Sequence, residues 1–309
     1  MKAIKNVFSL KALTGQTVVF ILMLASCQKD NDILTSIDTQ NVNGESVGSS
    51  YMTESSDIST NAIGGLSTTQ YSGARMDGDP VLGLDIRDGR FKCATTTISR
   101  AGTKDNPAGT ITISFNPNCT DNPGIKRSGT IVISYKGRRW VPGSYFVVKA
   151  DFYRNGAHIE GTDTVTTKLS ADTLVSRGGF LQFRSVLTGG QVTFADGKTV
   201  TREHDITREW FRGAVPTNDE WHTLAGGTAT GTCKNGNTYE MQITKTLVHK
   251  LSCLGSKVVI PVSGTKVVTV TGTKNKQYSI DYGDGTCDNT VTVTVGSKVQ
   301  TITVNGDGN

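Results

Sequence analysis

The feature that most constrains the fold is a series of short segments in which apolar and polar residues alternate. In Gly109–Phe115, the apolar side chains of Ile111, Ile113 and Phe115 alternate with threonine and serine. Period-two alternation with β-branched residues is typical of a strand that buries one face. The same pattern recurs at 129–135, 144–153, 179–186, 191–195, 238–248, 266–272, 277–283, 290–296 and 299–304.

Pairs of turn-forming residues lie between these segments. The pairs are Asn155-Gly156, Gly189-Gly190, Asp196-Gly197 and Asn235-Gly236. Asn-Gly and Asp-Gly favour type I′ turns, which join antiparallel strands. The sequence therefore predicts an all-β domain over residues 89–309, built as an antiparallel meander of hairpins. A sandwich, a barrel and an elongated sheet are all compatible with this pattern.

Two parts of the predicted domain resemble each other. The segment GTITISFNPNCTDN (109–122) precedes GTIVISY, and YSIDYGDGTCDN (278–289) precedes TVTVTV. Each has a strand, a Gly/Asn/Pro turn with a cysteine, an Asp-Asn pair and another strand. This similarity suggests two related units, 89–165 and 250–309, separated by a middle section. Convergent hairpin composition is the alternative.

The same similarity suggests the disulfide pairing. Each unit also has a cysteine upstream of its turn, which gives the pairs Cys93–Cys119 and Cys253–Cys287 and leaves Cys233 over. Disulfides form in proteins that are exported from the cytoplasm. In the chain-entropy model, loops of this length each stabilise the fold by about 3–4 kcal/mol. Zinc is the rival interpretation of the cysteines, but the paired spacing of a zinc site is missing.

The segment before the domain is rich in Ser, Thr, Asn, Asp and Gly. Residues 27–88 contain few large apolar residues and show no sustained period. Such a composition does not bury enough apolar surface to offset the entropy of ordering. We therefore predict a flexible tether, which as a coil of roughly fifty residues would reach about 35–45 Å. The alternative is that residues 58–84 add a helix or an edge strand to the fold.

The N-terminus has the features of a signal peptide, which we assign to residues 1–26. Lys2, Lys5 and Lys11 precede an apolar stretch at 12–25 that is too short to span a bilayer. A short buried helix is the alternative. The segment Leu24-Ala25-Ser26-Cys27 resembles the lipobox of bacterial lipoproteins. This resemblance implies cleavage before Cys27 and acylation of its sulfur, and two or three acyl chains anchor a protein stably.

The residues that follow Cys27 are Gln28-Lys29-Asp30-Asn31-Asp32. They partly resemble the export signal of surface lipoproteins of Bacteroidota, in which acidic residues follow a lysine, although Asn31 interrupts the acidic pair. We therefore predict an outer membrane lipoprotein exposed on the cell surface. Its first partner is membrane lipid, bound through acylated Cys27. A periplasm-facing anchor is the alternative.

The net charge gives no reason to expect a nucleic acid partner. The full chain carries +5, and the signal peptide contributes three lysines and no acid, so the mature chain carries 5 − 3 = +2. A nearly balanced chain lacks the basic surface that binds nucleic acid.

We find no motif for a catalytic site and predict no catalytic residue and no cofactor. Asp281, Asp284 and Asp288 form a weak calcium candidate, with a disulfide-pinned turn as the alternative. The tryptophans Trp140, Trp210 and Trp221 lie near arginines in the sequence and are candidates for stacking on glycan rings. Core packing is the alternative for each of them.

Several further segments resemble all-β surface lipoproteins of Bacteroidota. They are SGTIVISYKGR, the Tyr153–Gly156 turn followed by IEGT, KLSC and IDYGDGTCDN. The resemblance covers most of residues 90–309 and implies a location and a fold class, without an activity. We expect a non-enzymatic binding or structural module that contacts glycan or an envelope protein. The alternatives are a surface polysaccharide hydrolase and an accessory subunit of a nutrient-uptake complex.

Overall fold

The computed structural model describes residues 34–64, 89–103, 105–121, 124–139, 141–169, 181–211, 215–258, 260–272 and 275–305. Contacts place Leu34–Asn309 in one compact unit. The helical elements are α1 (Ser36–Gly64), η1 (Gly89–Phe91), η3 (Pro216–Asn218) and η4 (Leu251–Ser256). The strands are β1 (Ala94–Gly102), β2 (Pro107–Thr120), β3 (Lys126–Lys136), β4 (Tyr145–Arg154), β5 (Ala157–Leu169), β6 (Leu181–Thr193), β7 (Thr199–Phe211), β8 (Glu220–Thr223), β9 (Thr228–Thr232), β10 (Thr238–Lys250), β11 (Ser263–Thr271), β12 (Lys276–Asp284), β13 (Thr290–Val295) and β14 (Lys298–Thr303).

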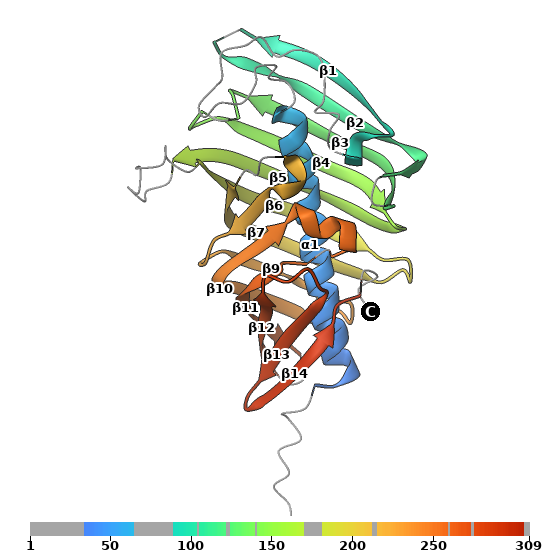
Figure 1. Cartoon of the computed structure of the whole chain (residues 1–309), viewed down its shortest axis with the longest axis vertical. Helices are drawn as coiled ribbons and strands as arrows, with labels where there is room; N and C mark the ends of the chain where they lie inside the picture. Colours follow the sequence, from blue (N-terminus) through green and yellow to red (C-terminus); the bar gives the residue numbers. More distant parts are fainter. Residues whose placement is uncertain are drawn as a thin grey trace, which may run out of the picture. The chain divides into compact units, whose positions relative to one another are not determined.

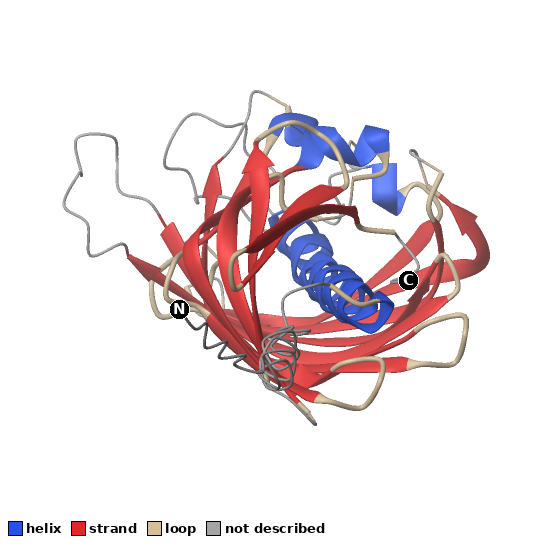
Figure 2. Ribbon diagram, turned by 90° about the horizontal axis from the view of Figure 1, so that it is seen from below, coloured by secondary structure: helices blue, strands red, loops and turns tan. Residues whose placement is uncertain are grey.

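All the strands belong to one antiparallel sheet, which confirms the predicted all-β meander. Its fourteen strands follow the chain order from β1 to β14, except that β9 lies off the main path. Both β8 and β9 pair with β7 and with β10, so together they fill one position in the sheet. The sheet curls around α1, as Figures 1 and 2 show. We call the face toward α1 the concave face and the other the convex face.

Alternation along the strands decides which side chains meet α1. In β2, Ile111 and Ile113 are fully buried, and the alternating Thr110 and Thr112 are partly exposed. In β13 the valines are buried in the same way, between threonines at 290, 292 and 294. Apolar residues therefore cover the concave face, and threonine, which fits a pleated strand and tolerates water, covers much of the convex face.

The predicted turns are correct at three of four positions. Asn155-Gly156 joins β4 to β5, and both residues have positive φ, at 49° and 86°, as a type I′ turn requires. Asp196-Gly197 and Asn235-Gly236 also lie between paired strands. The turn predicted at Gly189-Gly190 is wrong, because both glycines lie inside β6 at a shift in the register with β7. The glycine pair makes a bulge here.

The prediction of a flexible tether is wrong for residues 36–64, which form α1. The remaining tether residues, 27–33 and 65–88, lie outside the described residues. Sixteen of the 29 residues of α1 are Ser, Thr, Asn or Gly, a composition with low helix propensity. Most of its side chains are nevertheless buried, including Val42, Val47, Tyr51 and Ile58. The sheet therefore stabilises a helix that its own sequence does not favour.

Local hydrogen bonds satisfy many of the polar groups of α1. Thr35 and Asp38 form a reciprocal capping box, in which Thr35 N donates to Asp38 Oδ2 at 2.8 Å and Asp38 N donates to Thr35 Oγ1 at 3.2 Å. Along the helix, the hydroxyls of Ser50, Ser59 and Thr60 donate to backbone carbonyls four residues earlier. Hydroxyls bonded in this way can be buried without losing a partner.

α1 crosses much of the sheet. Its side chains bond to β12 at one end and to β3 toward the other. Eight interstrand steps separate β12 from β3 in the strand order, which at about 4.8 Å each is about 38 Å. Asp38 and Glu54 are 54 − 38 = 16 residues apart, which is about 24 Å along the helix axis and less than the distance along the sheet, because the sheet curls around α1. The helix therefore lies across the strands and connects most of the sheet.

Both predicted disulfides are confirmed. Cys93 and Cys119 are joined with Cα atoms 5.4 Å apart, and Cys253 and Cys287 with Cα atoms 5.2 Å apart. The second disulfide holds η4 to the segment after β12. Buried residues of and after η4, including Val258 and Ile260, pack into the same core as α1. Figure 2 shows the short helices over α1, opposite the floor of the curled sheet. The division into two related units stays a prediction.

Candidate functional site: the concave face and its helix

Glu45, near the middle of α1, is the most buried acid of the concave face. Its carboxylate pairs with Arg202 of β7, at 2.8 Å between Oε1 and Nη1, and with Lys266 of β11. All three side chains are at most 3% exposed. Burial alone would raise the pKa of Glu45, but Lys266 and Arg202 outweigh it and lower the pKa. The carboxylate is therefore ionised and holds two strands to the helix.

Glu54, further along the helix, makes a second cluster with the strands at the other end. It pairs with Arg127 of β3 and with Arg154 of β4, where Oε2 lies 2.9 Å from Nε. Arg127 also pairs with Asp121 at the start of the β2–β3 connection. Burial by itself raises the pKa of Glu54, but Arg127, Arg154 and Arg90 together lower it to about 2.

Two more acids of α1 pair with the sheet. The Asp57 carboxylate lies 2.6 Å from Arg208 of β7, and the Asp38 carboxylate lies 2.6 Å from Lys276 of β12. The hydroxyl of Tyr278 also donates to Asp38. Each carboxylate of α1 thus pairs with at least one cation of the sheet. The helix neutralises a concave face that would otherwise expose several buried cations.

A serine, a histidine and an aspartate also meet on this face. Ser185 Oγ donates to Asp163 Oδ1 at 2.7 Å and lies 2.8 Å from His204 Nε2. Burial raises the pKa of Asp163, and burial together with Arg202 and Arg208 lowers the pKa of His204 well below its usual range. In a hydrolytic triad the histidine lies between the serine and the carboxylate. Here the serine lies between them, and all three residues are at most 7% exposed, so the arrangement is that of a buried polar network.

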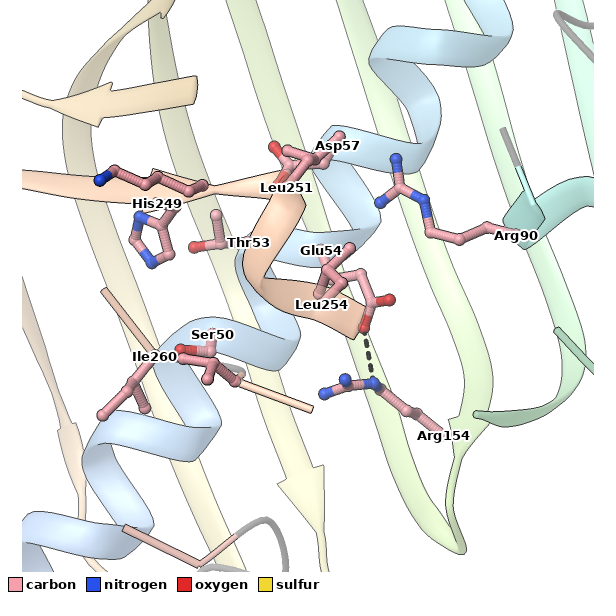
Figure 3. Close-up of a pocket in the computed structure, with 12 residues that line it drawn as sticks. Ser50, Thr53, Glu54, Asp57, Arg90, Arg154, His249, Leu251, Leu254 and Ile260 are labelled. Carbon is pink, nitrogen blue, oxygen red and sulfur yellow. Dashed lines mark ion pairs between the residues drawn. The ribbon is translucent and has the colours of Figure 1, made fainter. Parts of the chain in front are cut away.

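A small cavity of about 50 Å³ lies between α1 and the segment around η4 (Figure 3). In the close-up, Glu54 points toward Arg154, and His249 lies near Thr53. Among the described residues, His249 Nδ1 is buried without a hydrogen-bond partner. The volume suits one or two water molecules, at about 30 Å³ each. It is far below the roughly 300 Å³ of a typical small-molecule site.

Two of the three tryptophans predicted to stack on glycan rings lie in or against the core. Trp221 is 3% exposed, so the prediction that it forms an exposed stacking platform is wrong. Its ring stacks on Trp210 at 5.8 Å between centroids and lies under the guanidinium of Arg208 at 4.3 Å. Trp210 is partly buried and donates from Nε1 to Asp219 at 2.9 Å. These rings pack the core near α1. Trp140 lies outside the described residues.

The three aspartates of the calcium candidate bond to their own turns. Asp281 accepts from Gly283 N at 2.9 Å, Asp284 from Thr286 N at 3.1 Å, and Asp288 from Thr290 N at 2.9 Å. Aspartates that accept from the backbone two residues later are typical of tight turns. Within the part of the chain that the structure describes, no group of three metal-ligating side chains comes together.

Cys233 is a buried free thiol next to the Glu45 cluster. It is 2% exposed, and burial followed by the charge of Glu45 raises the pKa of the thiol to about 12. Because the thiolate is the reactive form, we expect the folded protein of residues 33–309, which lacks Cys27, to resist alkylation by iodoacetamide. The same protein unfolded in urea without reductant should take up one equivalent, counted by mass spectrometry. Stoichiometric labelling of the native form would contradict the buried position.

Comparisons with known proteins do not assign the chain to a family. Neither a protein-family model, nor a curated protein, nor a solved structure matches the chain. Among the described helices, none combines the length and apolar character needed to cross a membrane. Cys27, the predicted lipidation site, lies outside the described residues.

Proposed function

We propose that this chain is an outer membrane lipoprotein, exposed on the cell surface and anchored through acylated Cys27, and that its folded part is a non-enzymatic binding or structural module. The observation that carries the proposal is the segment Leu24-Ala25-Ser26-Cys27 after a short apolar stretch, followed at once by polar residues. Two or three acyl chains on Cys27 are sufficient for a stable membrane anchor.

The filled concave face supports a role without catalysis. The carboxylates of α1 are committed to ion pairs, and the cavity beside Glu54 has room for water and not for a sugar ring. A glycosidase needs two carboxyl groups that flank an accessible substrate. The buried acids of this face lie under α1 and η4, where a polysaccharide chain does not reach.

The partner surface is then the convex face and the loops around it. The convex face presents many threonines together with charged side chains, including an exposed ion pair between Arg184 and Asp205, and a histidine, His158, stacked on Tyr153 at 4.3 Å between ring centroids. Hydroxyl groups and a stacked aromatic pair suit a glycan or a polar protein surface. We assign glycan or another envelope protein as the partner class.

Two experiments test the proposal. Mass spectrometry of the native protein should find an acylated N-terminal Cys27, and an unmodified thiol or an intact Met1 contradicts the anchor. A glycan array with residues 33–309, which retain α1, tests the module, with released sugars assayed in parallel. Specific capture without cleavage is the expected result, whereas product formation favours the alternative of a surface hydrolase.

A further inference from the structure

The point at which the chain enters the fold is fixed in the structure. The first turn of α1 is held by the capping box of Thr35 and Asp38 and by the bonds of Asp38 to Lys276 and Tyr278 of β12. Further along, Glu45 fixes the helix to β7 and β11. Extending the free chain beyond Thr35 would break buried ion pairs, so the entry point lies at the start of β12.

Only a short stretch of chain separates this entry point from Cys27. From Cys27 to Thr35 there are 35 − 27 = 8 residue steps. A fully extended chain of that length spans at most about 29 Å, whatever the arrangement of the residues between. As a coil it averages about 15 Å. Because residues 36–64 form α1, they do not add to the reach of the chain between Cys27 and the fold, for which the sequence predicted about 35–45 Å.

The surface around the entry point combines exposed apolar and basic side chains. Ile37, in the first turn of α1, is 53% exposed, and Val299, at the start of β14, is 66% exposed. The β12–β13 register pairs Ser279 with Thr294, and β13 ends one residue later at Val295, before the turn at Gly296-Ser297. The β13–β14 turn, with Lys298 and Val299 after it, therefore lies next to the strand that holds Asp38. Figure 1 shows this hairpin and the start of α1 at the same end of the sheet.

We infer that the end of the sheet formed by β12–β14 and the first turn of α1 faces and contacts the lipid surface, and that the β1–β4 end points away from it. The inference rests on the proposed lipid anchor at Cys27. The short connection keeps this end within reach of the headgroups, where Val299 and Ile37 enter the interfacial layer and Lys298 lies beside lipid phosphates. The opposite end of the sheet, about 40 Å away along α1, stays accessible to a glycan or an envelope protein.

Fluorescence quenching in vesicles tests this orientation. The acylated protein is labelled through a single new cysteine, either Gln300→Cys on β14 or Thr97→Cys on β1, both at exposed positions. The buried Cys233 and the four disulfide cysteines leave the new thiol as the reactive one among the described cysteines. Lipids with a nitroxide on the headgroup should quench the label at 300 several-fold more than the label at 97. Equal quenching at both positions, or stronger quenching at 97, overturns the inference.

A lengthened connection is the matched control. Inserting about 30 Gly/Ser residues between Asp32 and Ile33 raises the average reach to about 35 Å. Quenching at position 300 should then fall at least twofold, and unchanged quenching would show that chain length does not set the orientation. Vesicle flotation separates the two proposals. Protein that fails to float contradicts the lipid anchor, whereas protein that floats without differential quenching contradicts only the orientation.

Discussion

Replacing Glu45 with glutamine is expected to lower the free energy of unfolding by about 3–5 kcal/mol, because it leaves Arg202 and Lys266 buried without their counter-charge. Both cations are at most 3% exposed, so water does not replace the lost carboxylate. Domains of ordinary stability have about 5–15 kcal/mol in total. The variant should therefore unfold at a much lower urea concentration, measured by circular dichroism.

The matched control is Glu240→Gln on β10. Glu240 is exposed, so the same chemical change there should alter stability by less than about 0.5 kcal/mol. If the two variants unfold at the same urea concentration, the charge pairs of α1 contribute nothing to stability. Because glutamine is close to glutamate in size, Glu45→Gln tests the negative charge and not the packing of the side chain.

Acidification is expected to lower the free energy of unfolding over two overlapping pH ranges. Burial, together with Arg208 and Lys266, lowers the pKa of His249 from 6.5 to about 3. The unfolded chain therefore binds a proton that the folded chain rejects, and stability falls as the pH drops below 6.5. With allowance for the part of this side chain that reaches solvent, the loss is about 2 kcal/mol by pH 4.5. His204, whose pKa is lowered in the same direction, adds to the loss.

At lower pH, protonation of the carboxylates of α1 lowers the free energy of unfolding further. Glu54 has a pKa lowered from 4.5 to about 2, so its stabilisation is complete above the unfolded pKa and is lost as the pH falls toward the folded value. The difference corresponds to roughly 3 kcal/mol. Glu45 and Asp38 shift in the same direction. Asp163 opposes them, because burial raises its pKa and protonation favours its folded form.

Urea unfolding at a series of pH values measures this profile. The variant His249→Gln should lose about 2 kcal/mol of the pH dependence between pH 6.5 and 4.5. Gln242→Ala, at an exposed position of β10 without a titrating group, is the control and should leave the shape of the profile unchanged. Stability that stays constant between pH 7 and 5 in the unmodified protein would rule out neutral buried histidines.

The strands were predictable because their signal is local. In β2, β3, β12 and β13, each apolar residue lies two positions from the next, and the period itself assigns one face to the core. The turn at Asn155-Gly156 was predictable for the same reason. Gly189-Gly190 failed because a glycine pair favours a bulge as well as a turn, and only the pairing of β6 with both neighbours decides between them.

The sequence contains a signal for the charge clusters of the concave face. Arg154, Arg202 and Lys266 each stand in the apolar phase of their strand, in register with Phe152, Val200 and Val268. A cation in that phase must be buried, and a buried cation requires an acid nearby. Three such cations indicate that a further helix or strand with acidic side chains packs on the same face of the sheet. The sequence alone would not have placed that element in residues 36–64, whose composition favours disorder.

By itself the sequence determined an antiparallel meander, its hairpins and the two disulfide pairs, and it predicts the lipid anchor. Each of these depends on neighbours within one strand, one turn or one recurring segment. The tertiary structure decided that a serine-rich segment becomes a buried helix. Glu45 meets Arg202 and Lys266 across 157 and 221 residues of chain. Such a pair exists only in the folded sheet, because a buried charge is stable only where the fold brings its counter-charge.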